Sequence, residues 1–266
     1  MNINNFILIL FLAFFSTSCS KYQKVLKSDD FDYKYQKALE YYHEGDYNRA
    51  LPLFNELSTV MMGTLNIEKI SYYFAYCHYS TGDNLMAAYL FDNYTKSFPN
   101  GKHHEECSYM RAFCYYLESP NYSLDPTNNY KAINELQEFI DKYPESSKID
   151  TCNILIDQLT DKLSKKAFEN AKQYFITENY KAAIKALDNV IIDFPSLRNR
   201  EEAHFLIIKS NYLLAINSIS DKMEERLMQT INIYEQFKDN YKKSKYLEEL
   251  EVIYNDTKGQ LDKLKI

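Results

Sequence analysis

His103 and Cys107 lie four residues apart in the stretch GKHHEECSYM, a spacing that can place both side chains on one face of a helix. Histidine and cysteine are zinc ligands, but a protein zinc site uses four ligands, or three and a water. Nothing in the sequence supplies the remaining ligands, whereas Glu105 and Glu106 suit the start of a helix, where carboxylates favour the helix dipole. We therefore expect a helix to start in this stretch, and neither a metal nor another cofactor.

Motifs typical of enzymes are missing from the sequence. It has no phosphate-binding loop, dinucleotide-binding glycine pattern, nucleophile elbow or paired-histidine zinc motif. Only 5 glycines occur in 266 residues, which leaves little scope for glycine-rich catalytic loops. The net charge is -6 and the Lys and Arg residues are scattered, so no basic surface for nucleic acid is indicated. We expect a binding protein that is not an enzyme and has no nucleic-acid partner.

Cys19 could carry a different chemistry, the attachment of lipid. It ends the stretch FILILFLAFFSTSC, in which ten apolar residues from Phe6 to Phe15 precede small polar ones. A membrane-spanning helix needs roughly 20 apolar residues, and a shorter run at the N-terminus is typical of an export signal. The cysteine resembles that of a bacterial lipobox, which predicts a signal peptide over residues 1–18 and a lipid anchor on Cys19. The alternative is an ordinary secretory signal that is cut near a cysteine.

Beyond residue 30 the chain repeats a pattern of small and large apolar residues. The small residue recurs at Ala50, Ala87, Ala132 and Ala183, each followed four residues later by Phe or Leu. This pattern is typical of tetratricopeptide repeats (TPRs), helix–turn–helix units with a period near 34 residues. We predict an all-α fold, an α-α superhelix of about five TPR-like repeats over residues 31–266 with a C-terminal capping helix, whose alternative role is to dock a partner. The expected parts are a lipidated linker (19–30), repeat units at about 32–63, 68–100, 104–145, 164–196 and 201–242, and a last helix at 245–265.

Tyrosines recur at the positions of the repeat register that face the inner surface of such an array. In the first helices of the first three units these positions hold Tyr35, Tyr42, Tyr72, Tyr76, Tyr79, Tyr109 and Tyr116. A tyrosine combines a flat apolar ring with a hydroxyl, which suits binding of an extended peptide. The alternative is that some of these rings pack between helices, since the chain has 25 tyrosines. The fourth unit differs and suggests a second functional half, because its positions hold Lys165, Phe168, Lys172 and Phe175.

Four cysteines follow Cys19, and all lie within or beside apolar helical patterns: Cys77, Cys107, Cys114 and Cys152. A free cysteine in such a place behaves as a small apolar residue. We expect core thiols, with a bridge from Cys107 or Cys114 to Cys152 as the alternative.

The chain resembles the BamD family, the lipoproteins of the bacterial β-barrel assembly machinery. The resemblance rests on the lipobox-like N-terminus, the five repeats, the segment YMRA (Tyr109 to Ala112), and the insertion SPNYSLDPTNN with the helix that follows it. It covers nearly the whole chain after Cys19. The chain departs from the repeat pattern at Lys34 and Lys37, which stand where first helices usually carry apolar residues.

The resemblance implies a non-catalytic scaffold, lipid-anchored in the outer membrane and facing the periplasm. Its implied partners are unfolded outer-membrane proteins, held by the first half, and the barrel-forming insertase subunit with other assembly lipoproteins, held by the second. Two other classes stay open at this point. One is a peptidoglycan-linked periplasmic coordinator with the same repeats, and the other is a SusD-like glycan-binding surface lipoprotein.

The lipid anchor predicts the behaviour of Cys19→Ser. This variant should fold but no longer sediment with membranes, because the thiol that accepts the lipid is gone. Membrane fractionation with mass spectrometry of the mature N-terminus tests it. Retention in the membrane fraction without lipid would contradict the anchor.

Overall fold

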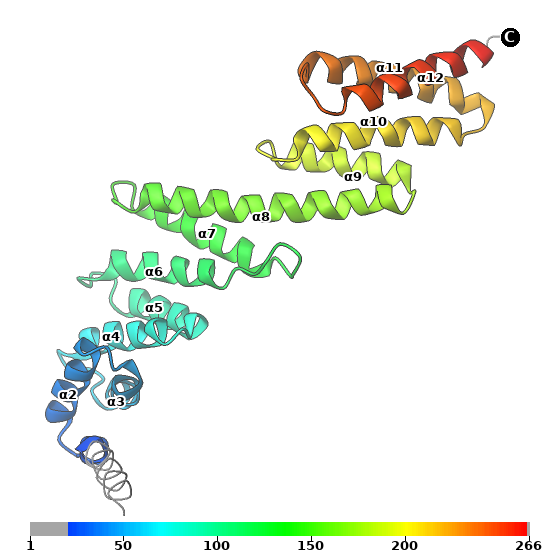
Figure 1. The fold of residues 1–266 in the computed structure, drawn as a ribbon. Coiled ribbons are helices and arrows are strands. Elements are labelled where there is room, and N and C mark those ends of the chain that lie inside the picture. The colour runs from blue at the N-terminus through cyan, green and yellow to red at the C-terminus, as the bar shows by residue number, and fades with distance from the viewer. Residues whose placement is uncertain (1–20, 265–266) are drawn as a thin grey trace, which may run out of the picture. The chain divides into compact units, whose positions relative to one another are not determined.

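The computed structural model describes residues 21–264, so the predicted signal peptide and Cys19 lie outside the described residues. Within this range the structure has eleven helices, α2–α12, and a helical stretch at residues 21–26, which confirms the all-α prediction (Figure 1). The helices are α2 (Phe31–His43), α3 (Tyr47–Val60), α4 (Ile67–Ser80), α5 (Asn84–Ser97), α6 (His104–Leu117), α7 (Thr127–Lys142), α8 (Ile149–Ile176), α9 (Tyr180–Asp193), α10 (Arg200–Ile216), α11 (Ser220–Asn240) and α12 (Leu247–Leu264). No helix in the described range is both long enough and apolar enough to cross a membrane.

The helices form two compact units. The first comprises residues up to Ser119 together with Thr127–Ile156, and the second comprises Pro120–Pro126 and Asp157 onward. In the first unit each helix from α2 to α7 packs against the next, and in the second unit α9 to α12 do the same. The predicted insertion therefore belongs, by its contacts, to the second unit.

Fully buried alanines hold paired helices close together. Ala50, Ala87, Ala132 and Ala183 all have 0% exposed surface, as do the large residues four positions later, Phe54, Phe91, Leu136 and Leu187. The small side chain lets the two backbones approach, and the large one fills the adjacent groove, so the apolar interior is close-packed. This confirms the positions that the sequence pattern indicated.

Three helix-to-helix turns share one backbone geometry. Gly45, Gly82 and Glu178 each follow a first helix with positive φ angles of 78°, 82° and 60°. The amide that follows each of them donates to the carbonyl five residues earlier, at 2.8 to 2.9 Å, which is the Schellman arrangement. Glycine adopts this conformation without strain, whereas Glu178 has a Cβ that disfavours it.

Helix α8 is longer than the sequence pattern predicted. The fourth unit was expected to begin near residue 164, but α8 runs unbroken over 28 residues from Ile149 to Ile176. Cys152, Leu155, Leu159 and Leu163 are all buried at intervals of three or four residues, which is helical spacing. No Gly or Pro falls within this stretch to interrupt it.

The last helix packs onto the second unit. α12 contacts both α10 and α11, and it buries Leu250, Thr257 and Leu261. Leu264, at the end of the helix, is 38% exposed. These contacts favour the capping role for this helix.

The four cysteines of the described range are buried free thiols, as expected. Burial raises the pKa of Cys77 and Cys114 to about 12 and also raises the pKa values of Cys107 and Cys152. All four are therefore neutral and unreactive in the folded state at physiological pH.

Helix termination at Glu178 gives a stability prediction. Glu178→Gly should stabilise the protein by about 1 kcal/mol, because glycine adopts the positive φ without a Cβ clash. Thermal unfolding followed by circular dichroism measures the change. The matched control is Gly82→Glu, which places a side chain at the equivalent position and should destabilise by a similar amount; a neutral or destabilising Glu178→Gly would contradict the strain at this turn.

Candidate peptide-binding surface

The candidate site is a continuous row of aromatic rings on the first helices of the first three repeats. We call it the aromatic row. Consecutive ring centroids along it are 4.7 to 6.4 Å apart, within the range of direct aromatic contact. In spatial order its members are Tyr42, Tyr73, Tyr72, Tyr76, Tyr79, Phe113 and, on either side of Phe113, Tyr109 and Tyr116.

The helices α2, α4 and α6 place these rings. Each is the first helix of its pair, and in α4 the residues Tyr72, Tyr76 and Tyr79 lie three and four positions apart, which puts them on one face. Ala75, between them in sequence, is fully buried, and the three tyrosine rings pack against the core to which it belongs. The rings themselves are neither buried nor fully exposed, so each shows part of its surface to solvent.

One of the seven predicted tyrosines lies elsewhere. Tyr35 is only 5% exposed and belongs to the core formed by α2, α3 and the start of α4. The helical stretch 21–26, which the sequence pattern suggested was a linker, contributes Val25 (3% exposed) to the same core. Tyr35 therefore packs inside, as the alternative interpretation held for some of these rings. The other six belong to the aromatic row.

Glu106 joins two repeats at the middle of the row. The hydroxyls of Tyr72 and Tyr76 in α4 donate to its Oε1 at 2.9 and 2.5 Å. His103 Nδ1 lies 3.2 Å from its Oε2, and the His103 ring is 4.1 Å from that of Tyr72. The sequence identified Glu106 only as an acidic residue near a helix start; its partners lie 30 and 34 residues earlier, roughly one repeat away.

These contacts fix the charge of the site. Burial alone would raise the pKa of Glu106, but the hydrogen bonds from Tyr76 and Tyr72 and the neighbouring His103 hold it below its usual value. Burial and the Glu106 carboxylate raise the pKa values of Tyr72 and Tyr76 well above the usual range. At neutral pH the site thus presents one carboxylate bound by two protonated phenols.

His103 and Cys107, whose spacing could have placed them on one face of a helix, lie in different surroundings. Cys107 is 0% exposed in the core between α5 and α6, while His103 contacts Tyr72 and Glu106 at the surface. Among the described residues no group of three or more His, Cys, Asp or Glu side chains could hold a metal ion.

Tyr109 ends the row beside a basic residue. Its ring is 5.7 Å from that of Phe139, and Lys148 Nζ lies 5.3 Å from its centroid. The row therefore carries a carboxylate near its centre and an ammonium group at this end. Such a surface can hold apolar side chains against its rings and polar backbone groups against its hydroxyls and charges.

Arg111, in the segment YMRA, links neighbouring helices and is not part of the aromatic row. Its guanidinium lies 2.9 Å from Asp92 in α5 and 2.6 and 3.1 Å from Glu135 and Glu138 in α7. It is only 14% exposed, so it links three successive helices through charge-assisted contacts. Burial raises the pKa of Glu135 despite this arginine.

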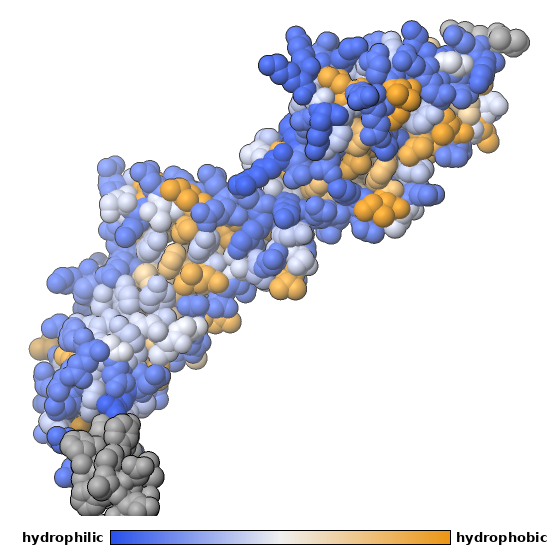
Figure 2. Space-filling model, in the orientation of Figure 1, coloured by the Kyte–Doolittle hydropathy of each residue, from blue (hydrophilic) through white to orange (hydrophobic). Residues whose placement is uncertain are grey.

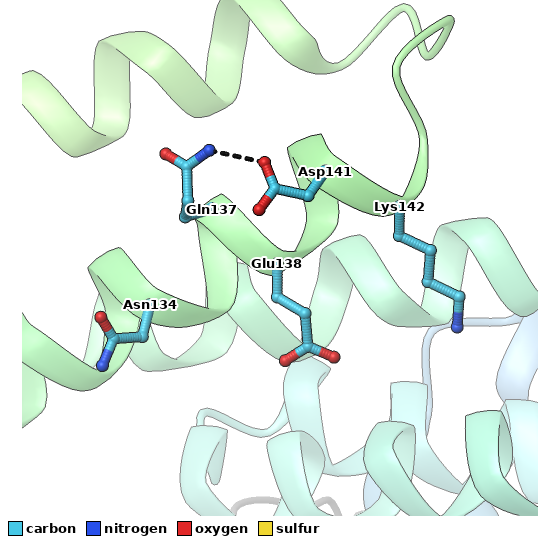
Figure 3. Close-up of a pocket in the computed structure, with 5 residues that line it drawn as sticks. All are labelled: Asn134, Gln137, Glu138, Asp141 and Lys142. Carbon is cyan, nitrogen blue, oxygen red and sulfur yellow. Dashed lines mark hydrogen bonds between the residues drawn. The ribbon is translucent and has the colours of Figure 1, made fainter.

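Two open pockets lie outside the aromatic row, and no residue of the row lines either of them. One, of about 500 Å³, lies along α7 and is lined by Asn134, Gln137, Glu138, Asp141 and Lys142. Figure 3 shows Gln137 bonded to Asp141 on one side of this helix, at 2.9 Å, with Glu138 and Lys142 extending from the other. The second, of about 550 Å³, lies in the second unit between the insertion, α8 and the α9–α10 connection.

The equivalent positions of the fourth repeat have a different character, as predicted. Phe168 is 1% exposed and lies in the core, and Lys172 Nζ pairs with Glu202 at 2.5 Å. Lys165 Nζ lies 4.2 Å from the ring centroid of Tyr122 in the insertion. The second unit therefore offers ion pairs where the first offers tyrosines.

Consecutive helices packed in pairs, with buried alanines at the repeat positions, define a TPR-like repeat protein. The chain belongs to the YfiO family of outer-membrane lipoproteins, whose model matches residues 28–227. This is the BamD family, so the resemblance drawn from the sequence is confirmed.

Two solved TPR structures are similar to this chain at low sequence identity. The P58(IPK) TPR domain is 14% identical, with a TM-score of 0.42 over 91% of this chain and 68% of that one. The Podosopora anserina kinesin light chain TPR-like repeats are 13% identical, with a TM-score of 0.32 over 79% of this chain and 94% of that one. No curated protein sequence matches the chain.

The Glu106 contacts predict a pH-dependent stability difference. Glu106→Gln should destabilise the protein at pH 7 by about 0.5–1 kcal/mol. This is at the low end of the range for hydrogen bonds to a charged group, because the Glu106 side chain is 44% exposed. The pKa of Glu106 is lower in the folded state than in the unfolded state. The stabilisation is therefore fully present at pH values above the unfolded-state pKa and is lost as the pH falls through the folded-state pKa.

The measurement is the melting temperature of both proteins across pH. The difference should shrink as the pH falls below about 4, because the wild-type carboxyl is then protonated as well. The exposed Glu145, in the α7–α8 connection, provides the control Glu145→Gln. A difference that is the same at pH 3 and pH 7 would contradict the role of the charge.

Proposed function

We propose that this family member is a lipid-anchored, non-catalytic subunit of the β-barrel assembly machinery, and that its aromatic row holds extended segments of unfolded barrel proteins. The observation that carries the proposal is the row itself, six of the predicted tyrosines in contact along three successive repeats. The spacing of its rings suits a strand-like segment, whose side chains alternate in direction every residue.

The first unit would act by binding alone. Each ring buries apolar surface of the segment. The tyrosine hydroxyls form hydrogen bonds with its backbone, and the Glu106 carboxylate accepts them from its amides. No bond is made or broken. Binding shifts the population of the segment from unfolded to extended, and release passes it on.

The second unit would hold the barrel-forming insertase and other assembly lipoproteins. Support comes from the different surface of its first helix, where the ion pair Lys172–Glu202 and the contact of Lys165 with Tyr122 replace the tyrosines. We further propose that lipidated Cys19 fixes the chain to the outer membrane, with its body in the periplasm. This proposal goes further than the family description, which states an outer-membrane lipoprotein.

The two other classes raised by the sequence make different demands. A glycan-binding surface lipoprotein needs a sugar platform, for which tryptophan is the usual residue, and this chain has none. A peptidoglycan-linked coordinator shares the repeats and is separated by its partners. Co-purification from membranes distinguishes the classes, because only a subunit of the assembly machinery would co-purify with the insertase.

The aromatic row predicts the effect of removing single rings. Tyr76→Ala or Tyr109→Ala should weaken binding of a peptide from the C-terminal strand of a barrel protein by about 1 kcal/mol or more, as anchor truncations do. Calorimetric titration with the peptide measures the affinity, and a melting curve on the same sample measures stability.

The matched control is Tyr130→Ala, which removes an exposed tyrosine of α7 that is outside the row and 54% exposed. Its affinity for the peptide should equal that of the wild type. Unchanged affinity in both row variants, together with a large loss of stability, would show that the rings serve packing and would move the binding site, most plausibly to the insertion between Leu117 and Asn129.

A further inference from the structure

Exposed apolar side chains gather at one end of the first helix pair. Leu65 is 101% exposed and Met62 is 75% exposed in the α3–α4 connection, and Val60, the last residue of α3, is 47% exposed. At the start of α2, Phe31 and Tyr33 are 38% and 43% exposed. We call these five residues the apolar tip.

The five residues lie at the same end because α2 and α3 are antiparallel. Near the start of α2, Lys34 Nζ lies 2.8 Å from Glu56, which is near the end of α3. At the other end, the ring centroids of Tyr42 and Tyr47 are 5.4 Å apart. The end of α3, and with it the α3–α4 connection, is therefore beside the start of α2.

The tip is suited to a less polar surrounding than water. Residues 57–67 contain no charged side chain, in a chain where 26% of residues are charged. The connection also bonds its own polar groups, since the Thr64 hydroxyl and amide both donate to the Met61 carbonyl, at 2.8 and 3.1 Å. Entry of this connection into a membrane interface would thus bury no charged side chain.

The predicted anchor lies close to this end of the hairpin. The Leu26 carbonyl accepts a hydrogen bond from Lys34 Nζ at 3.1 Å, and Val25 shares a core with Met61. Residues 21–26 are helical. Cys19 is outside the described residues, but the length of chain from Leu26 limits its distance from Leu26 to about 15 Å, at helical rise for residues 21–26 and full extension before them.

Exposed apolar residues also occur elsewhere in the described range, such as Leu85, Met86 and Tyr89 in α5. Figure 2 shows a largely hydrophilic face with apolar residues in separate spots. Single exposed apolar residues are ordinary on soluble proteins, but several together mark a contact surface. The carboxylates of Asp29, Asp30 and Asp32, beside Phe31 and Tyr33, are exposed and limit the depth to which this end can insert.

We propose that the apolar tip inserts into the head-group region of the bilayer that carries the lipid anchor, so that the first repeat contacts the membrane through Phe31, Tyr33, Val60, Met62 and Leu65. The inference rests on the lipid anchor proposed above. Insertion is shallow, about 5–10 Å, as for interfacial helices. It gives the first unit a second attachment point and thereby a defined orientation on the membrane.

A single tryptophan can test this, because the chain contains none of its own. Leu65→Trp in the lipidated full-length chain is reconstituted into phosphatidylethanolamine–phosphatidylglycerol vesicles with brominated acyl chains, which quench tryptophan only on contact. The matched control is Val252→Trp in α12, at a residue that is 67% exposed. Both positions are exposed, and circular dichroism checks that both variants fold.

The expected result is that Leu65→Trp emits at shorter wavelength and is quenched at least about threefold more than Val252→Trp, as the depth of about 5–10 Å requires. A chain that floats with the vesicles while both tryptophans stay equally unquenched overturns this inference and leaves the anchor intact. A chain that does not float contradicts the anchor, and the inference falls with it.

Discussion

The close approach of paired helices at fully buried alanines is the constraint on which both units depend. Where Ala50, Ala87, Ala132 and Ala183 lie, no larger side chain fits without separating the helices. The bulky residues of the second helices therefore fill the grooves four positions later. The aromatic row borders the same core, because its rings in α4 and α6 pack against the cluster that contains Ala87. Its continuity follows from ring contacts that link α2 to α4 and α4 to α6.

Much of the fold could be predicted from the sequence, since alanine spacing and turn residues are local signals. The burial of Cys77, Cys107, Cys114 and Cys152 followed from the same helical patterns. The length of α8 was missed because the repeat register was followed beyond the point where it applies. The apolar spacing from Cys152 to Leu163, with no Gly or Pro, was itself sufficient evidence for one helix.

The candidate site was only partly predictable, and the reason is tertiary. Six tyrosines could be assigned because they share a register, but the burial of Tyr35 depends on a core that includes Val25, outside the repeats. The role of Glu106 depends on hydrogen bonds to a helix one repeat earlier. Lys34, which breaks the apolar pattern of first helices, is 1% exposed and is satisfied by Glu56 and the Leu26 carbonyl. A buried ammonium is tolerated only with such partners, and no local pattern identifies them.

The position of the thiols has a consequence for how the chain can fold outside the cytoplasm. All four cysteines of the described range lie in the first unit and are buried there. While unfolded, the same thiols are accessible, and four cysteines can pair in about three fully bridged ways, whereas the native structure has all four free. In an oxidising compartment, the first unit must therefore fold before its thiols are oxidised. This limit does not apply to the second unit. The rate at which a thiol reagent modifies the native protein would report the opening of the first half alone.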